Sequence, residues 1–277
     1  MNAETTSSEN SIARTVVVHL HYQDVWNELA DAINQISPNR LLITSTGTPD
    51  SVAKIQAKFP YAEIFNVQNR GRDIYPLVFL SNLGKFDDES IVWKLHSKKS
   101  VHILRGDSWR RELMEAICGS KTRANSVATL LKGDEISMVG ADRYLTILSD
   151  ENLADHQNLF DLWNARLGSS LPLQDMPYVA GTIFACKSQV LSDLKKLQLK
   201  ESDFFLESHR GNLFGKSYAI ALLLMSYLQH LAFISRIRRR LDIKTRPASK
   251  ETYALEAFLG QLARRYGTVN GVENLAS

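Results

Sequence analysis

The stretch TVVVHLHYQDVWNELADAINQISPNRLLITST, residues 15–46, contains the pattern that decides the fold class. It opens with a short β-branched run at residues 15–20, which is typical of a buried strand. Apolar residues then recur at helical spacing from Val25 to Ile36, and Pro38 ends that pattern. A second short apolar run follows at residues 40–46. A strand, a helix and a second strand in this order predict a βαβ unit with parallel strands.

The same alternation continues along the chain. We expect further strands at residues 62–67, 90–95 and 136–140, and helices at residues 48–58, 74–83, 106–118 and 123–132. The second half is less regular, with a helix around residues 154–167, a strand-like run at residues 178–186 and further helices beyond it. The sequence therefore predicts an α/β fold in which a mainly parallel sheet is flanked by helices.

The composition is that of an ordinary globular protein. Of the 277 residues, 44% are hydrophobic and 23% are charged, which excludes disordered, collagen-like and low-complexity classes for the body of the chain. The net charge of +3 is too small to indicate nucleic-acid binding by itself. Cys118 and Cys186 both lie in apolar stretches and cannot alone form a disulfide framework or a zinc site. We therefore expect a reducing compartment.

The two ends of the chain differ from its body. Residues 1–13 are polar and lack the features of a signal peptide, so we interpret them as a disordered leader of a cytoplasmic protein. Residues 14–234 form the expected main domain. Its most apolar segment, residues 218–234, is shorter than the roughly 20 residues that a spanning helix needs, so we predict a buried helix there.

Residues 235–277 form an expected helical C-terminal extension that is basic and amphipathic. Four arginines lie in Arg236–Arg240, and apolar residues recur at helical spacing through Leu255, Phe258, Leu259 and Leu262. One interpretation is a helix that packs on the domain and exposes a basic face. The other is attachment to an anionic membrane surface through Arg236–Arg240. Because no aromatic residues interleave the basic run, nucleic acid is not an expected partner.

Two polar clusters follow expected strands, where parallel sheets bind their ligands. The first is Asn69-Arg70-Gly71-Arg72-Asp73, in which Gly71 permits a sharp turn. Asp73 is either a simple N-cap of the next helix or part of an anion pocket. In such a pocket Arg70 or Arg72 would bind phosphate, assisted by backbone amides at the helix start.

The second cluster follows the expected fourth strand and contains Lys94, His96, Lys98 and Lys99. Alternation along the strand directs Lys94 and His96 to one face of the sheet and the residues between them to the other. A lysine in a buried strand must have a partner, because an unpaired buried charge is unfavourable. The segment is either a solvated basic turn or a phosphate clamp for a sugar nucleotide.

Several enzyme classes lack support in the sequence. It contains no G-x-x-x-x-G-K-[ST] loop, no G-x-G-x-x-G after a strand, no H-E-x-x-H and no G-x-S-x-G. These absences argue against P-loop ATPases, dinucleotide dehydrogenases, zincins and typical α/β hydrolases. The remaining histidines, at positions 156, 209 and 230, are scattered, and we expect them to be structural.

The two clusters also carry a resemblance to a known family. The sequence resembles the rhamnan synthesis F family of bacterial cell-surface polysaccharide assembly, and the likeness covers about residues 14–230. It rests on VVVHLHY at residues 16–22, NVQNRGRDIYPLVFL at 66–80, IVWKLHSKKSVH at 91–102, WRREL at 109–113, MVG at 138–140 and YVAGTIF at 178–184. The pairing of N-x-G-R-D with K-L-H-[ST]-K-K-S is the most specific part of this pattern.

The resemblance implies a GT-A-like, Rossmann-like nucleotide-sugar transferase core. In that fold the first strand and the turn after the third strand hold the nucleotide, and the fourth strand usually ends in an Asp-x-Asp that binds a metal. Here His96-Ser97-Lys98 occupies that place, so the resemblance implies an enzyme without a metal or other cofactor. Lys98, Lys99 and the arginines would then neutralise the leaving diphosphate. Asp87-Asp88 is expected to be a turn.

The implied roles cover most of the two clusters. His21 and Tyr22 would line the base pocket. Asn69, Arg70, Arg72 and Asp73 would hold the ribose and diphosphate, and Gly181 and Thr182 would lie near the acceptor. Lys94, His96, Lys98 and Lys99 would stabilise the leaving group.

The catalytic base is less defined. The family's G-T-x-x-H-x-x-E-R-like stretch matches poorly to ESHRGNLFGKSYAIALLL at residues 207–224, where Glu207 and His209 remain as candidates. An inverting transferase needs a carboxylate or histidine to take the acceptor proton, and Asp142 and Glu207 are our candidates for this base. His96, at the leaving group, completes the expected catalytic set.

The expected function is transfer of a hexose or deoxyhexose from a nucleotide-diphosphate sugar, such as dTDP-rhamnose or a UDP-sugar. The expected acceptor is a growing glycan, either an oligosaccharide or lipid-linked, and other polysaccharide-assembly proteins are expected partners. The expected location is the cytoplasm, with peripheral attachment to the inner face of the cytoplasmic membrane as an alternative. Two rival functions remain: a non-catalytic scaffold subunit that keeps a vestigial pocket, and a basic peripheral protein without sugar chemistry.

Overall fold

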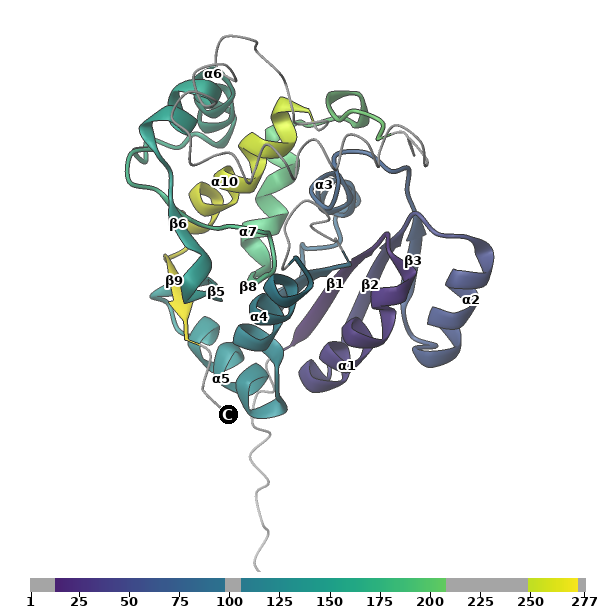
Figure 1. The fold of residues 1–277 in the computed structure, drawn as a ribbon. Coiled ribbons are helices and arrows are strands. Elements are labelled where there is room, and N and C mark those ends of the chain that lie inside the picture. The colour runs from purple at the N-terminus through teal and green to yellow at the C-terminus, as the bar shows by residue number, and fades with distance from the viewer. Residues whose placement is uncertain (1–12, 98–105, 208–248, 274–277) are drawn as a thin grey trace, which may run out of the picture.

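The computed structural model describes residues 13–97, 106–207 and 249–273. Its centre is a seven-stranded sheet in the order β3-β2-β1-β4-β8-β5-β9 (Figure 1). Strand β8 pairs antiparallel with both of its neighbours, β4 and β5, and all other neighbouring pairs are parallel. This confirms the mainly parallel sheet. The strands are β1 (Arg14–Leu20), β2 (Arg40–Ser45), β3 (Glu63–Asn66), β4 (Ile91–His96), β5 (Ile136–Ala141), β8 (Phe184–Lys187) and β9 (Thr268–Val272).

Helices cover both faces of this sheet (Figure 1). One face packs against α1 (Trp26–Ile36), α2 (Pro49–Lys58), α4 (Gly106–Cys118) and α5 (Lys121–Lys132). The other packs against α3 (Tyr75–Asn82), α6 (Asp150–Leu167), α7 (Ser188–Ser192) and α10 (Lys250–Arg264). Strand alternation divides the core, so Val16 and Val18 contact the first group of helices and Val17 contacts the second.

Short elements complete the described chain. They are the two-stranded sheet of β6 (Leu145–Ile147) and β7 (Pro177–Val179) and the 3₁₀ turns η1 (Gln23–Val25), η2 (Asp142–Tyr144), η3 (Asp193–Leu197) and η4 (Glu201–Asp203). Cys118 and Cys186 are buried, unpaired and on opposite faces of the sheet. Burial raises the pKa of both thiols.

The strand expected at residues 178–186 is wrong in one respect, because the structure divides it into β7 and β8. Gly181 and Thr182 separate the two strands, with φ of 87° and 56°. Such left-handed backbone cannot continue a strand. The chain therefore turns here and enters the main sheet as β8, next to the end of β4.

The C-terminal helix packs on the domain, as the first of the two interpretations given above expected; the basic face that it also expected is not tested by this packing. Its apolar stripe is buried to 2% exposure or less at Leu255, Phe258, Leu259 and Leu262. Thr268–Val272 adds β9 to the sheet beside β5, a strand that the sequence pattern did not predict. Arg236–Arg240 and the apolar segment 218–234 lie outside the described residues. Within residues 13–97, 106–207 and 249–273, no helix combines the length and apolar character that a membrane span requires.

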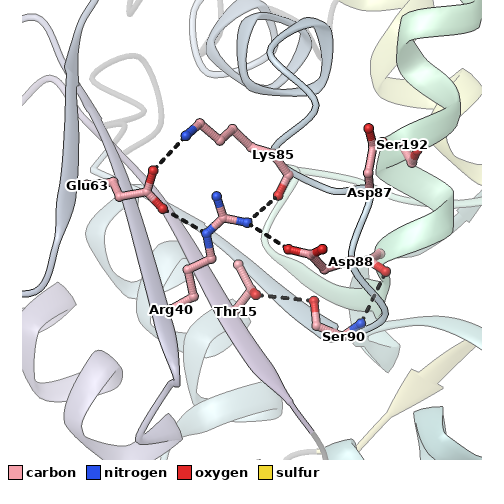
Figure 2. Close-up of polar contacts among 9 residues, drawn as sticks. Thr15, Arg40, Glu63, Lys85, Asp87, Asp88, Ser90 and Ser192 are labelled. Carbon is pink, nitrogen blue, oxygen red and sulfur yellow. Dashed lines mark hydrogen bonds and ion pairs between the residues drawn. The ribbon is translucent and has the colours of Figure 1, made fainter.

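An ion-pair network ties together the edge of the sheet where β2 and β3 begin (Figure 2). Glu63 bonds Arg40 at 2.8 Å and Lys85 at 2.6 Å, and Arg40 also lies 3.5 Å from Asp88. Partial burial would raise the pKa of Glu63, but the hydrogen bonds from Arg40 and Lys85 outweigh it and lower that pKa. Asp87 bonds Ser192 and Lys195. Asp87 and Asp88 thus both make structural contacts at the amino edge, the edge of the sheet where the parallel strands begin.

Candidate functional site

Polar side chains form a row across the opposite edge, where the parallel strands end. His19 on β1 is aligned with Thr44 on β2 and with His96 on β4. Lys94 lies two residues before His96 and therefore points to the same face. Trp93 and Leu95 pack on the other face, among the core residues around α1 and α4. The alternation predicted for this strand is confirmed.

Lys94 is buried and donates to two side chains in the described part of the chain. Its side chain is 1% exposed, and its ammonium donates to the Asp73 carboxylate and, at 2.9 Å, to the Thr182 hydroxyl. The Thr182 hydroxyl donates in turn to the same carboxylate. The expectation that a buried lysine must be paired is confirmed. The three side chains come from β4, from the loop after β3 and from the turn before β8, so the network joins distant parts of the chain.

The loop at residues 69–73 directs Asp73 toward the sheet. Gly71 and Arg72 have φ of 51° and 55°, so the chain makes the sharp turn that the glycine predicted. A Cβ on Gly71 would lie 2.5 Å from the Phe204 ring, which leaves no room for a side chain. Ile74, not Asp73, occupies the N-cap of α3, and no side chain caps that helix. The N-cap interpretation of Asp73 is therefore wrong.

His96 is held by the turn before β8. Its ring is 5% exposed, and Nε2 lies 2.7 Å from the Gly181 carbonyl oxygen and 3.7 Å from the Asp73 carboxylate. A carbonyl only accepts hydrogen bonds, so the geometry assigns a proton to Nε2. The positive φ of Thr182 is unusual for a β-branched residue, and such strain clusters at functional sites.

His19 belongs to the site although the sequence analysis did not select it. Its Nδ1 lies 3.1 Å from the Thr44 hydroxyl. Burial, reinforced by the nearby Lys94 and His21, lowers its pKa to about 3 against the opposing effect of Asp73, so His19 is neutral. The signal was available: in residues 15–20, the same alternation that buries Val17 directs His19 to the face that carries Lys94.

Ser97 connects the ends of β1 and β4. Its hydroxyl accepts hydrogen bonds from the backbone N–H groups of His21 and Tyr22, both at 2.8 Å. Its own N–H donates to the His19 carbonyl at 3.0 Å. His21 also contacts Thr46 through Nδ1 at 2.7 Å. The segment predicted to line a base pocket is therefore fixed beside the end of β4.

Glu207 lies beside the loop at residues 69–73. Its backbone N–H donates to the Asn69 carbonyl at 2.7 Å, and the Asn69 amide donates to the Glu207 carbonyl at 3.1 Å. Its carboxylate lies 3.8 Å from Arg72. Arg70 instead bonds Glu201 at 3.1 Å and the Phe204 carbonyl at 3.0 Å. Arg72 is thus paired with Glu207, whereas Arg70 is bound by Glu201 and Phe204.

The remaining candidates are placed differently. Asp142 is exposed at the end of β5, and β8 separates that strand from β4. It shares the edge of the sheet but does not join the network around Asp73. Lys98, Lys99 and His209 lie outside the described residues. Among the residues that are described, no three His, Cys, Asp or Glu side chains group as metal ligands.

The charged side chains at this edge are mostly buried and paired with one another. Asp73 and Lys94 neutralise one another in the interior, and they fix Thr182 and His96 in defined positions. Arg72 and Glu207 provide one cation and one carboxylate beside them, each with a side chain 21% exposed. The edge therefore combines a rigid buried network with a partly accessible charged pair.

Comparisons with known proteins agree with this sequence pattern. A family model described as rhamnan synthesis protein F (RgpF) matches residues 1–228. Two proteins named "Uncharacterized protein WxcX", from two strains of Xanthomonas campestris pv. campestris, are each 29% identical over 248 residues. The match covers 87% of this chain but only 35% of each relative, so the chain spans about a third of their length. No solved structure matches. Because the family model covers most of the sequence, the chain belongs to the rhamnan synthesis F family.

Proposed function

We propose that this chain is a metal-independent glycosyltransferase with a GT-A-like fold. It would move a hexose or deoxyhexose, of the rhamnose type, from a nucleotide-diphosphate sugar to a growing surface glycan. Membership of the rhamnan synthesis F family connects the chain to rhamnan and related polysaccharide synthesis. The observation that carries the finer proposal is the convergence of β1, the loop after β3 and the end of β4 around Asp73, Lys94 and His96.

The donor would bind at the carboxyl edge of the parallel strands. Such edges bind nucleotides in many α/β proteins, because the loops that follow neighbouring strands meet there. His21 and Tyr22 would contact the base, and Asn69 and Arg72 the ribose and diphosphate. The geometry changes the proposed role of Lys94: because its ammonium is already bound by Asp73, it would position the site rather than contact phosphate directly.

The leaving diphosphate would be stabilised by fixed cations. In an inverting transfer the acceptor hydroxyl attacks the anomeric carbon, a base takes its proton, and the electron pair of the broken bond leaves with the diphosphate. Arg72, Lys98 and Lys99 would meet the charge on that group. The sequence His96-Ser97-Lys98 at the end of β4, in place of a pair of acids, supports a mechanism without a metal.

The proposed base is Glu207, and His96 would stabilise the leaving group. Glu207 lies 3.8 Å from Arg72, the residue proposed to bind the diphosphate, so its carboxylate would border the diphosphate position. Asp142 remains a candidate only for an acceptor that extends along the sheet edge to the end of β5. Gly181 and Thr182 would lie between the donor and this acceptor region.

A non-catalytic scaffold subunit is the second candidate function. Two observations favour it: the Lys94 charge is taken up by Asp73, and Arg72 already has Glu207 as a partner. A protein of this kind would retain nucleotide binding without sugar transfer, or would lose both. Partner proteins of polysaccharide assembly would then supply the catalysis.

Arg72→Ala and Lys98→Ala test the donor site. Each variant is expected to weaken UDP or dTDP binding by about 1–3 kcal/mol, because a charge-assisted hydrogen bond to phosphate is lost. Isothermal titration calorimetry measures this change. Lys85→Ala is the matched control, because Lys85 pairs with Glu63 at the amino edge of the sheet. The Lys85→Ala variant should bind UDP or dTDP with the affinity of the parent protein. Unchanged affinity in both test variants would remove the proposed site.

Attachment to an anionic membrane through Arg236–Arg240 is a separate proposal, suggested by a lipid-linked acceptor. Truncation after Ile234 is unsuitable as a test, because it would remove α10 and β9 from the fold. Replacing the four arginines by serine should instead abolish sedimentation with vesicles that contain phosphatidylglycerol. Equal sedimentation of parent and variant would contradict the proposal.

A further inference from the structure

The C-terminal helix α10 contributes to the candidate site from outside the segment that the family model matches. That match ends at residue 228, and α10 begins at Lys250. The helix lies very close to β7, because a Cβ on Gly260 would stand 2.1 Å from the Pro177 carbonyl oxygen. Strand β7 leads directly into the turn of Gly181 and Thr182. The helix is therefore packed against the backbone that enters this turn.

One face of α10 reaches both loops of the site. Tyr253, Glu256 and Gly260 are spaced by three and four residues, so they share a helix face. The Arg72 guanidinium lies over the Tyr253 ring, 5.2 Å from its centroid. The Glu256 carboxylate accepts a hydrogen bond from the Gly181 N–H at 2.8 Å. A single helix face thus contacts the loop after β3 and the turn before β8.

Gly181 links Glu256 to His96. Its N–H is bound by the carboxylate, and its carbonyl oxygen lies 2.7 Å from His96 Nε2. The turn is strained, since Thr182 holds a positive φ while its hydroxyl binds Asp73. A charge-assisted hydrogen bond at Gly181 opposes the relaxation of that strain.

We propose that Glu256 is a positioning residue, which holds the turn of Gly181 and Thr182 and thereby sets the orientation of the His96 imidazole. Tyr253 acts alongside it by holding Arg72. The effect of Glu256 on the His96 orientation is argued from its contact with Gly181 and the contact of Gly181 with His96. The effect of Glu256 on nucleotide affinity rests on the proposed function. The site is therefore completed by a helix beyond the family-matched segment.

Glu256→Ala and Glu256→Gln test this role. Glutamine keeps an oxygen that can accept from Gly181, and alanine does not. In spectra of protein with ¹⁵N-labelled histidine, the Nε2 signal of His96 should shift in Glu256→Ala and stay near its parent position in Glu256→Gln. Affinity for UDP or dTDP should fall about tenfold in Glu256→Ala and about threefold or less in Glu256→Gln.

Glu251→Ala is the control for helix α10 itself. It removes the same charge from the first turn of the same helix and should leave both readouts unchanged. An unchanged His96 signal in Glu256→Ala would overturn the positioning role, whatever the nucleotide data show. A shifted His96 signal in that variant, together with no nucleotide binding by the parent, would uphold the positioning role and overturn the proposed function.

Discussion

Asp73→Ala is expected to lower the free energy of unfolding by about 3–5 kcal/mol, the range for breaking a buried ion pair on one side. The substitution removes the carboxylate that neutralises the Lys94 ammonium, which is 1% exposed, and leaves its contact with the Thr182 hydroxyl. It also removes the carboxylate to which the Thr182 hydroxyl donates, leaving the Gly181 carbonyl, 2.8 Å away, as the other acceptor. Urea denaturation followed by circular dichroism measures the loss.

The double variant with Asp73→Ala and Lys94→Met separates two causes of lost stability. One is the buried Lys94 charge that has lost its carboxylate, and the other is the lost contact itself. Removing both partners eliminates the uncompensated buried charge, so the double variant should be more stable than Asp73→Ala alone. Asp88→Ala is the surface control, because its side chain is 86% exposed and lies 3.5 Å from Arg40. Its effect should be within about 0.5 kcal/mol. A loss below about 1 kcal/mol in Asp73→Ala would contradict the account of the buried network.

Gly260→Ala is expected to destabilise the protein by about 1–3 kcal/mol, the range for overpacking. In an exposed helix interior the same change would stabilise the chain by about 1 kcal/mol, because alanine is the better helix former. Here the added Cβ would lie 2.1 Å from the Pro177 carbonyl oxygen. Relieving this clash requires the backbone of α10 or of β7 to shift, which is unfavourable. The sign of the effect therefore reports the close packing of α10 on β7.

Gly133→Ala provides the comparison for this variant. A Cβ at Gly133 would meet its nearest neighbour, the Leu130 carbonyl, at 3.5 Å, which is ordinary contact. Its φ of −68° suits any residue, so the change should alter stability by no more than about 0.5 kcal/mol. A Gly260→Ala protein that melts above the parent would show that α10 does not approach β7 as described.

Local sequence pattern was sufficient for the part of the fold from β1 to β5. Strands β1 to β5 and the helices between them follow from short apolar runs, helical spacing and turn residues such as Pro38 and Gly71, all of which act over a few residues. Placement of the site at one edge followed from this topology alone, because the ends of parallel strands meet there. Alternation also gave the correct face for Lys94 and His96.

The remaining features depend on contacts between distant segments. Thr182 lies 88 residues from Lys94, and Glu256 lies 75 residues from Gly181, so no local pattern connects either pair. The break between β7 and β8 lies at a turn in which Thr182 has a positive φ and binds Asp73, 109 residues away. Strand β9 was missed for a similar reason, since it pairs with β5, more than 120 residues earlier, and contacts α10.

The measurement that tests the central proposal most directly is calorimetric binding of UDP, dTDP, GDP and CMP to the full chain. Each nucleotide is titrated with Mg²⁺, with Mn²⁺ and with EDTA. We expect one nucleoside diphosphate to bind with the same affinity under all three conditions, which would identify the donor class. Binding that requires Mg²⁺ or Mn²⁺ would contradict the metal-independent mechanism, and no binding of any nucleotide would contradict the donor site itself.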